Sequence, residues 1–416
     1  MSDYLAAPHM IRFRCLGSEC EDTCCKAWEI PVSNADVERL ARGIGQAETD
    51  AMVTRIKNGN RTMLVLKKLD TGACTKLDDK QLCSLHAAHG PDVLPAICHN
   101  YPRAVGRVDE ELELTGRLSC PEVARLALLH DEDTLAEAPP EPFGRVKVRL
   151  EVDTDDEVPY LTPFREVRGT IIELCMTPGY SVASRLYFIA QLSQMLGMFY
   201  HRDIRTLDRE RLAGMLLAIR QPDVQQELHQ QRGACSSMEG LALQVAQGLL
   251  YSRISSDKAF ERVGRKAAAT HAQAAQVAEQ TDMLKQLAEI GPERIWRCHQ
   301  ERRAALGPER TARLEDMLAR YCRSYWLQDW YPLSPNLLEH TMLLVLRVTL
   351  IRFLLVAHPD LHGAADAETV DKAAIEVFYA VARAYDHNAS IREGLANMLQ
   401  KRGMLSVAHA GALLKL

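Results

Sequence analysis

The sequence has no excess of basic residues. Its 416 residues include 50 lysines and arginines against 55 aspartates and glutamates, for a net charge of −5. Proteins that bind nucleic acid over a broad surface usually carry a basic footprint, so we expect no nucleic-acid partner. The N-terminal segment also lacks an apolar stretch of signal-peptide length, which predicts a cytoplasmic protein.

Long hydrophobic runs are rare as well. The most apolar run, Thr341 to Ala357, is shorter than the ~20 residues that span a bilayer. Arg347 and Arg352 interrupt it. We therefore predict a buried helix of a soluble protein, with both arginines paired to internal acids or reaching solvent. We expect no membrane partner and a monomeric chain.

Cysteines are plentiful and unevenly placed. Eight of the twelve lie in the first 120 residues, and Cys175, Cys235, Cys298 and Cys322 are scattered through the rest. In a reducing compartment, dense cysteines bind metal or take part in chemistry more often than they form disulfides. The eight predicted metal ligands are Cys15, Cys20, Cys24, Cys25, Cys74, Cys83, Cys98 and Cys120.

Three regions follow from the patterning. Residues 1–130 mix short helices with irregular, glycine- and proline-broken segments and form a cysteine-rich domain with little β-structure. Residues 131–160 are acidic and proline-rich, a linker in which Arg145 to Val152 alternates like one half-buried strand. Residues 161–416 show helical periodicity. The predicted fold is therefore mainly α, with an irregular metal-binding domain followed by an all-helical domain.

The cysteine spacing narrows the kind of metal site. The first block is Cys15-x4-Cys20-x3-Cys24-Cys25, the second is Cys74-x8-Cys83, and Cys98 and Cys120 follow singly. Zinc ribbons have paired C-x2-C knuckles, which are absent. Neighbouring cysteines cannot easily bind one ion, although they can bind different irons of a cluster. Thiolates suit zinc, copper(I) and iron–sulfur clusters, so the spacing alone leaves zinc and iron open.

These blocks resemble a known family. "FRCLGSECEDTCCKAWEIPV", "CTKLDDKQLCSLHAAHGPDVLPAICHNYPR" and "LSCPEVARLAL" are similar, in order and spacing, to the flagellin lysine-N-methylase (FliB-like) family. That family resembles the YkgJ-type cysteine-cluster proteins, taken to be zinc- or iron-chelating domains. The resemblance covers roughly residues 8 to 130.

The resemblance implies a protein-lysine N-methyltransferase. It implies transfer of methyl groups from S-adenosylmethionine to surface lysines of flagellin, a component of the bacterial flagellum. It also implies a [4Fe-4S] cluster held by the cysteine blocks, with zinc as the alternative. The glycine-rich loop usual in methyltransferases is missing, because Gly43-x-Gly45 follows a helical pattern and is better explained as a helix end.

Four further residues are candidates for the site. Methyl transfer requires the lysine ammonium to lose its proton, and a tyrosine or carboxylate can accept it, which points to Tyr101 and Asp22 as catalytic residues. Trp28 and Arg103 are the candidates for binding the cofactor, by an aromatic face and by pairing with its carboxylate. Each residue also has a structural explanation. Trp28 and Tyr101 could pack in the core, Asp22 could stabilise a turn, and Arg103 could form an internal ion pair.

Two other functions compete with the enzyme. The same thiols could make a non-catalytic module that stores or senses zinc or iron. Alternatively, a metal could staple an irregular domain onto a helical platform for protein interaction. The metal content and a methylation assay distinguish these functions.

Overall fold

The structure is a computed structural model that describes residues 4–26, 29–58, 61–130, 135–140, 147–155, 158–234, 239–277, 287, 289–386 and 389–416. Its residues form two compact units. Unit 1 contains Met1–Leu126, Glu132–Glu151 and Ser256–Lys258, and unit 2 contains Ala127–Asp131, Val152–Ser255 and Ala259–Leu416. The domain boundaries expected at residues 130 and 160 stay predictions.

A five-stranded mixed sheet runs through unit 1 in the order β6-β1-β5-β4-β7. β1 pairs in parallel with β5, while β4 and β5 form an antiparallel hairpin in which Arg103 lies opposite Gly116. The strands are β1 (Tyr4–Ala6), β4 (Arg103–Val108), β5 (Glu111–Gly116), β6 (Ala136–Glu137) and β7 (Val148–Val152). The strand predicted over residues 145–152 is thus observed as β7, with residues 145 and 146 outside the described part of the chain.

Unit 1 also contains short helices, of which α1 contacts β5 of this sheet. Ser33 begins α2 with a capping box, and Gly45 ends the helix with a positive φ of 87°. Gly43-x-Gly45 is therefore a helix end and not a cofactor loop. The helices of this part are α1 (Pro8–Arg12), η1 (Gly17–Glu19), α2 (Asn34–Ile44), α3 (Gln46–Met52), α4 (Ser84–His89), η2 (Pro91–Val93), α5 (Ala96–Asn100) and α6 (Pro121–Leu129).

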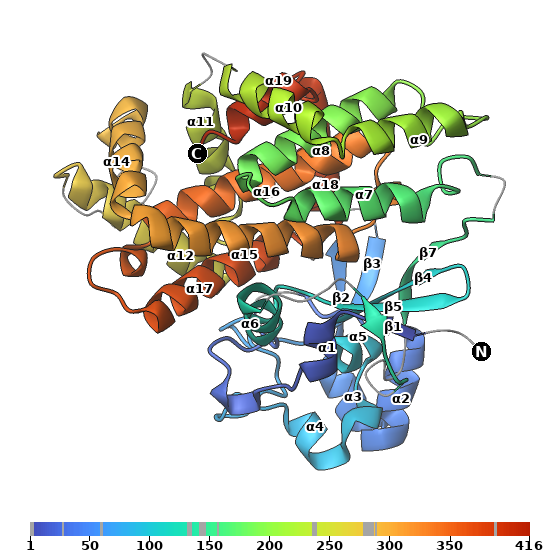
Figure 1. The fold of residues 1–416 in the computed structure, drawn as a ribbon. Helices are drawn as coiled ribbons and strands as arrows, with labels where there is room; N and C mark the ends of the chain where they lie inside the picture. Colours follow the sequence, from blue (N-terminus) through green and yellow to red (C-terminus); the bar gives the residue numbers. More distant parts are fainter. Residues whose placement is uncertain are drawn as a thin grey trace. The chain divides into compact units, whose positions relative to one another are not determined.

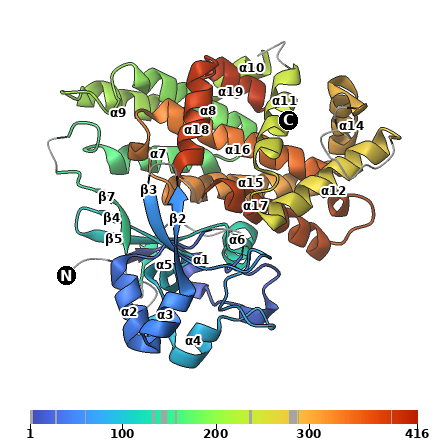
Figure 2. The ribbon, with the colours of Figure 1, turned by 180° about the vertical axis from the view of Figure 1, so that it is seen from behind.

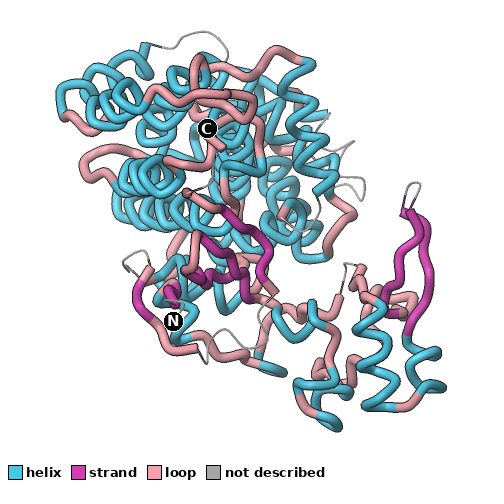
Figure 3. Tube along the Cα trace, turned by 90° about the vertical axis from the view of Figure 1, so that its right-hand side faces the viewer, coloured by secondary structure: helices cyan, strands magenta, loops and turns pink. Residues whose placement is uncertain are grey.

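A second, separate sheet consists of one hairpin. Strands β2 (Val53–Asn58) and β3 (Arg61–Leu66) pair antiparallel over six residues each, from Val53 opposite Leu66 to Asn58 opposite Arg61. In Figure 3 the hairpin extends as a narrow arm from the helices of its own unit. Backbone bonds from Val32 and Leu66 add the segment Ile30–Val32 to the base of β3.

Unit 2 is built from helices. Its long members surround α16, which runs through the middle of the unit and contacts α8, α11, α14, α17 and α19 (Figures 1 and 2). The helices are α7 (Phe164–Met176), α8 (Val182–Gly197), α9 (Arg209–Ala218), α10 (Pro222–Ala234), α11 (Glu239–Arg253), α12 (Lys258–Ala274), α14 (Pro292–Ala305), α15 (Gly307–Gln328), η4 (Tyr331–Leu333), α16 (Leu337–Ala357), η5 (Pro359–Leu361), α17 (Ala367–Tyr385), α18 (Ala389–Lys401) and α19 (Val407–Leu413).

The apolar helix α16 is the core of unit 2. It is long and apolar enough to cross a membrane, yet every residue of its most apolar window is buried inside the protein. Its two arginines are paired as predicted. Arg347 Nε lies 3.1 Å from Asp386 Oδ1, and Arg352 pairs with Glu315. Because each buried guanidinium has a carboxylate partner, the helix can be central without an unpaired charge.

The predicted class, mainly α with a mixed and irregular N-terminal part, is confirmed. The N-terminal part contains more strand than the single strand recognised in the sequence. Its strands β1 to β5 are three to six residues long and are separated by loops and short helices. Runs this short carry little periodicity, which explains why the pattern did not reveal them.

Candidate metal centre

Backbone pairing brings the first two cysteine blocks together. The amide of Cys74 donates to the carbonyl of Cys25 at 2.9 Å, and an adjacent β-bridge joins Lys26 to Ala73. Cys25 is itself held in a turn, where its amide bonds the hydroxyl of Thr23 at 3.2 Å. Residues 49 positions apart in the sequence thereby become neighbours.

Two further thiols are positioned by the loops that follow. Cys83 forms a β-bridge with Leu77 and directly precedes α4, while the amide of Leu77 bonds the carbonyl of Cys74. Cys98 lies in the middle of the one-turn helix α5. All four side chains meet at one apolar cluster. Cys74 is buried within it, among Ile30, Leu40, Leu85 and Leu94, and Cys25, Cys83 and Cys98 pack against it. We call Cys25, Cys74, Cys83 and Cys98 the core thiols.

The core thiols influence one another electrostatically. A hydrogen bond with Cys24, then burial, then the charges of Cys83 and Cys98 raise the pKa of Cys25. Burial raises the pKa of Cys98, and the charges of Cys74, Cys24 and Cys83 raise it further. Cys25 and Cys98 therefore hold their protons more firmly, in part because other thiols are near. A cation placed among them would reverse that effect and stabilise the thiolates.

The remaining four cysteines, Cys15, Cys20, Cys24 and Cys120, are called the flanking thiols. Cys120 directly precedes α6, and burial, followed by the charges of Cys20 and Cys24, raises its pKa to about 12. The Cys20 thiol donates to the carbonyl of Asp22 at 3.2 Å. Cys24 is exposed and interacts with both groups, since its charge also acts on Cys25 and Cys98. The two adjacent cysteines therefore have different surroundings. Cys25 is one of the core thiols, whereas Cys24 interacts with both the core and the flanking thiols.

These donors fit a thiolate-bound metal by their chemistry. Four soft ligands from separate segments of the chain gather at one cluster, and all eleven cysteines of the described residues are free thiols. As they stand, no three His, Cys, Asp or Glu side chains in the described part of the chain converge closely enough to enclose an ion. The thiols are thus gathered in one region, and binding requires side-chain adjustment to close the coordination shell.

The four other predicted site residues are placed differently. Tyr101 directly follows α5, three residues after Cys98, and its hydroxyl lies 3.1 Å from the hydroxyl of Ser119, the neighbour of Cys120. Asp22 lies in a bend, and its backbone carbonyl accepts a hydrogen bond from the Cys20 thiol. Arg103 is half-buried, and its pKa is lowered. Burial is the largest cause, the charge of the nearby Arg14 adds to it, and the charge of Cys15 opposes it. Trp28 lies outside the described residues.

Asp36 is a supporting residue that the sequence did not single out. Burial raises the pKa of its carboxyl, but hydrogen bonds from the backbone of Ser33 and Ala96 outweigh burial and lower it. One oxygen closes the capping box of α2, and the other accepts the amide of Ala96 at 2.9 Å, at the start of α5. This carboxylate therefore fixes the helix that carries Cys98. The bond to Ala96 joins residues 60 positions apart, which no local sequence pattern indicates.

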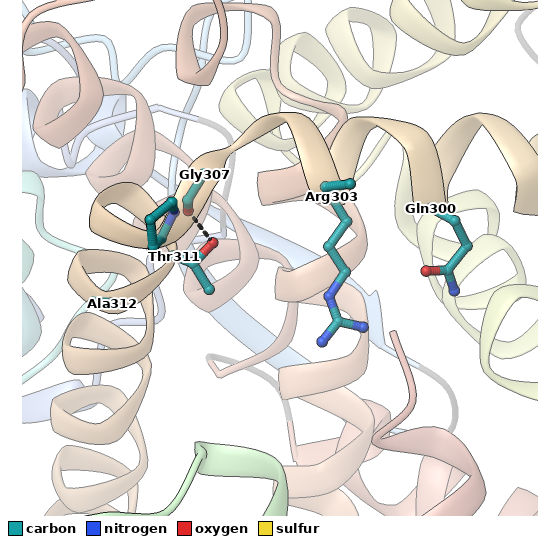
Figure 4. Close-up of a pocket in the computed structure, with 7 residues that line it drawn as sticks. Gln300, Arg303, Gly307, Thr311 and Ala312 are labelled. Carbon is teal, nitrogen blue, oxygen red and sulfur yellow. Dashed lines mark hydrogen bonds between the residues drawn. The ribbon is translucent and has the colours of Figure 1, made fainter.

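A pocket of about 680 Å³ is found elsewhere, in unit 2 (Figure 4). It is lined by residues of α14 and α15, among them Gln300, Arg303 and Thr311. The Arg303 guanidinium donates to the carbonyl of Lys415 at 3.0 Å, and the Thr311 hydroxyl donates to the carbonyl of Gly307. None of the predicted site residues lines this pocket, so it is separate from the thiol groups.

Two family comparisons cover most of the chain. Residues 168–413 match the FliB lysine N-methylase C-terminal domain. The chain belongs to the FliB lysine N-methylase family. Residues 14–121 match the CxxCxxCC family, described as zinc- or iron-chelating. That match contains all the core and flanking thiols.

Individual relatives agree with this membership. The chain is 31% identical over 144 residues to the flagellar biosynthetic protein FliU of Salmonella muenchen, covering 32% of this chain and 80% of that protein. It is 30% identical over 129 residues to a lysine-N-methylase of Salmonella typhimurium, covering 30% of this chain but only 32% of the relative. A lysine-N-methylase of Salmonella choleraesuis is likewise 30% identical over 128 residues, covering 30% and 32%. No solved structure matches.

The membership confirms the resemblance predicted from the cysteine blocks. It also confirms the predicted class of enzyme, a protein-lysine methyltransferase with a metal-chelating cysteine domain. The match to residues 168–413 adds a family assignment for the helical region, where the sequence motifs had given none.

Proposed function

We propose that this chain methylates lysine side chains of flagellin with S-adenosylmethionine, and that its cysteine domain holds an iron–sulfur cluster. The observation that carries the proposal is the gathering of four core thiols in the domain that matches a chelating family. The lysine-N-methylase relatives and the flagellar relative support the reaction and the substrate. The cytoplasm, where flagellin is made, is the compartment we propose.

The core thiols are the proposed cluster ligands. Cys25, Cys74, Cys83 and Cys98 provide the four thiolates that a cubane cluster needs. A bound cluster would tie together the four separate chain segments that carry its ligands. Cys24, whose charge acts on both Cys98 and Cys120, is then available with the other flanking thiols for a second metal.

Tyr101 is the proposed proton acceptor. The lysine amine attacks the methyl carbon only as the neutral amine, so one proton must leave before transfer. Tyr101 would accept the proton as the phenolate, and the Ser119 hydroxyl, 3.1 Å away, can donate to that oxygen and orient it. Arg103, half-buried beside Arg14, is the proposed partner of the cofactor carboxylate, and Asp22 and Trp28 remain secondary candidates.

The decisive experiment is anaerobic. The purified protein is incubated with S-adenosylmethionine and flagellin, and the flagellin is analysed by mass spectrometry. We expect methyl-mass increases on lysines, together with broad absorbance at about 400 nm from the cluster. Intact cluster without any lysine modification would overturn the enzyme proposal and favour the metal-storing or sensing alternative. A colourless protein with bound zinc would overturn the cluster proposal alone.

Tyr101→Phe tests the proton acceptor. We expect kcat to fall by about a hundredfold or more while the metal content and cofactor affinity stay unchanged, because only the proton path is removed. Ser119→Ala is the matched variant and should show a smaller loss, since the tyrosine hydroxyl remains but is no longer oriented. Equal kcat in Tyr101→Phe and the unmodified protein would exclude the role.

A further inference from the structure

The hairpin β2–β3 and the two residues after it carry charge of one sign only. Between residues 53 and 68 there are five basic side chains and no acidic one, in a chain whose net charge is −5. The five are Arg55, Lys57, Arg61, Lys67 and Lys68. A local positive surface of this kind attracts acidic partners and suppresses basic ones.

The cations at the base of the hairpin are already engaged. The Lys68 ammonium nitrogen lies 3.9 Å from a carboxylate oxygen of Glu29, and the Lys67 ammonium donates to the carbonyl of Asp50 at 3.3 Å. Arg55 and Lys57 differ: both are exposed, and neither forms an ion pair with another described residue. Being two positions apart in a strand, they share one face of β2. Two exposed positive charges therefore lie together on β2.

β2 is also the open edge of its sheet. The outer side of β3 is partly occupied, because Val32 donates to Leu64 at 3.0 Å and Leu66 donates to Ile30 at 2.9 Å. Among the described residues, β2 pairs with β3 alone. Alternate backbone amides and carbonyls of such an edge point outward and can pair with an added strand.

This edge is anchored to the thiol region. Met52 and Leu66 at the base of the hairpin lie in the same apolar cluster as Cys74, and a β-bridge joins Lys68 to Cys74. A segment seated on β2 would thus be held by the unit that contains the core thiols. The position of β2, its positive charge and its outward-facing backbone groups all favour the binding of an added strand.

We infer that β2 is a docking strand for an extended, acidic segment of the protein substrate, which adds to the hairpin edge and pairs with Arg55 and Lys57. The inference rests on the proposed function, since it requires a protein substrate. The competing explanation is protective, because charged side chains on an edge strand also prevent unwanted pairing between copies. A protective edge would not bind acidic strands, so binding distinguishes the two.

The test uses the full chain and a fluorescein-labelled peptide in which Glu alternates with Val. We expect measurable binding by fluorescence anisotropy, weakening as salt rises because the contact is electrostatic. A peptide in which Ser replaces Glu should bind much more weakly. In Arg55→Glu/Lys57→Glu the affinity for the acidic peptide should fall by at least about tenfold.

Arg205→Glu/Arg209→Glu is the matched control. It changes the net charge equally, at two exposed arginines of unit 2, and should leave the affinity unchanged. Circular dichroism and metal content verify that both variants fold. Equal affinities in the two double variants, or no binding by the unmodified chain, would overturn the inference.

The peptide assay needs no catalysis, so it separates this inference from the proposed function. Methylation of flagellin with no peptide binding would refute the docking strand and retain the enzyme. Binding without methylation of any lysine would retain the docking strand as an interaction site and refute the enzyme. Where both hold, Arg55→Glu/Lys57→Glu should raise KM for flagellin and leave kcat unchanged.

Discussion

Individual cysteines in this chain differ in role although they look alike in sequence. Cys83 packs against the apolar cluster with the other core thiols, whereas Cys175 is buried in helix α7 of unit 2, where Cys322 is a neighbouring thiol. Burial raises the pKa of Cys175 to about 12, which keeps it a neutral, inert thiol. We therefore expect Cys83, and not Cys175, to contribute to metal binding.

Replacing Cys83 by alanine should lower metal affinity by more than about tenfold, since loss even of an outer-shell partner commonly costs that much. Cys175→Ala, an equal change at a buried thiol, should leave the metal content intact. Metal analysis and visible absorbance after anaerobic purification check both variants. Equal metal content in the two would mean that Cys83 is not a ligand.

The buried pair of Arg347 and Asp386 is a second residue-scale feature. Both side chains are largely buried, at 5% and 13% exposure, and Arg347 also donates to the carbonyl of Leu343. Asp386→Asn removes the compensating charge, and we expect unit 2 to lose about 3–5 kcal/mol of stability in urea unfolding.

The exposed pair of Lys372 and Glu368 is the control for that measurement. Its side chains are 71% and 76% exposed, so Glu368→Gln should change stability by less than about 1 kcal/mol. A comparable loss in both variants would show that burial does not set the value of these ion pairs.

Among the elements, the contact between α2 and α5 controls the position of Cys98. The Asp36 carboxylate accepts bonds from both helix starts, and these bonds lower its pKa below the ordinary value of 3.8. A carboxyl group whose pKa is lowered by folding contributes its full stabilisation at pH values above its pKa in the unfolded chain. This stabilisation is lost as the pH falls through the lower value of the folded state.

Asp36→Asn should therefore weaken metal retention at neutral pH and show a smaller further loss than the unmodified protein as the pH falls below 3.8. The amide keeps an acceptor but loses the charge. Metal content measured across this pH series is the check. Identical acid profiles in the two proteins would exclude Asp36 as a titrating support.

At the scale of the molecule, unit 2 buries three histidines in neutral form. Burial lowers the pKa of His271 to about 4, and that of His299 and His340 to about 3. His271 and His299 are stacked nearly parallel with Phe353, and His340 packs between Tyr325 and Trp326. In the unfolded chain each would take up a proton near pH 6.5.

The unfolded state therefore binds more protons than the folded state from pH 6.5 down to about 4, and stability must fall with pH over that window. Three such groups give a slope of up to about 4 kcal/mol per pH unit. Denaturant unfolding of unit 2 across this range is the measurement. Constant stability between pH 6.5 and 4.5 would show that these histidines are charged or solvated in the folded protein.

Much of this protein was set by its sequence alone. The order and spacing of the cysteine blocks carried the family resemblance, and the apolar run with two arginines predicted a buried helix with internal ion pairs. These are local properties, because a period or a ligand spacing is contained within a few turns of chain.

The tertiary structure decided which thiols meet. Cys24 and Cys25 are adjacent in sequence, yet Cys25 is drawn into the apolar cluster by its backbone bond to Cys74, while Cys24 stays exposed. The tie from Asp36 to α5 and the open edge of β2 likewise depend on strands and loops far apart in the chain. Such contacts form only when loop closure is repaid by packing and pairing, so no local pattern records them.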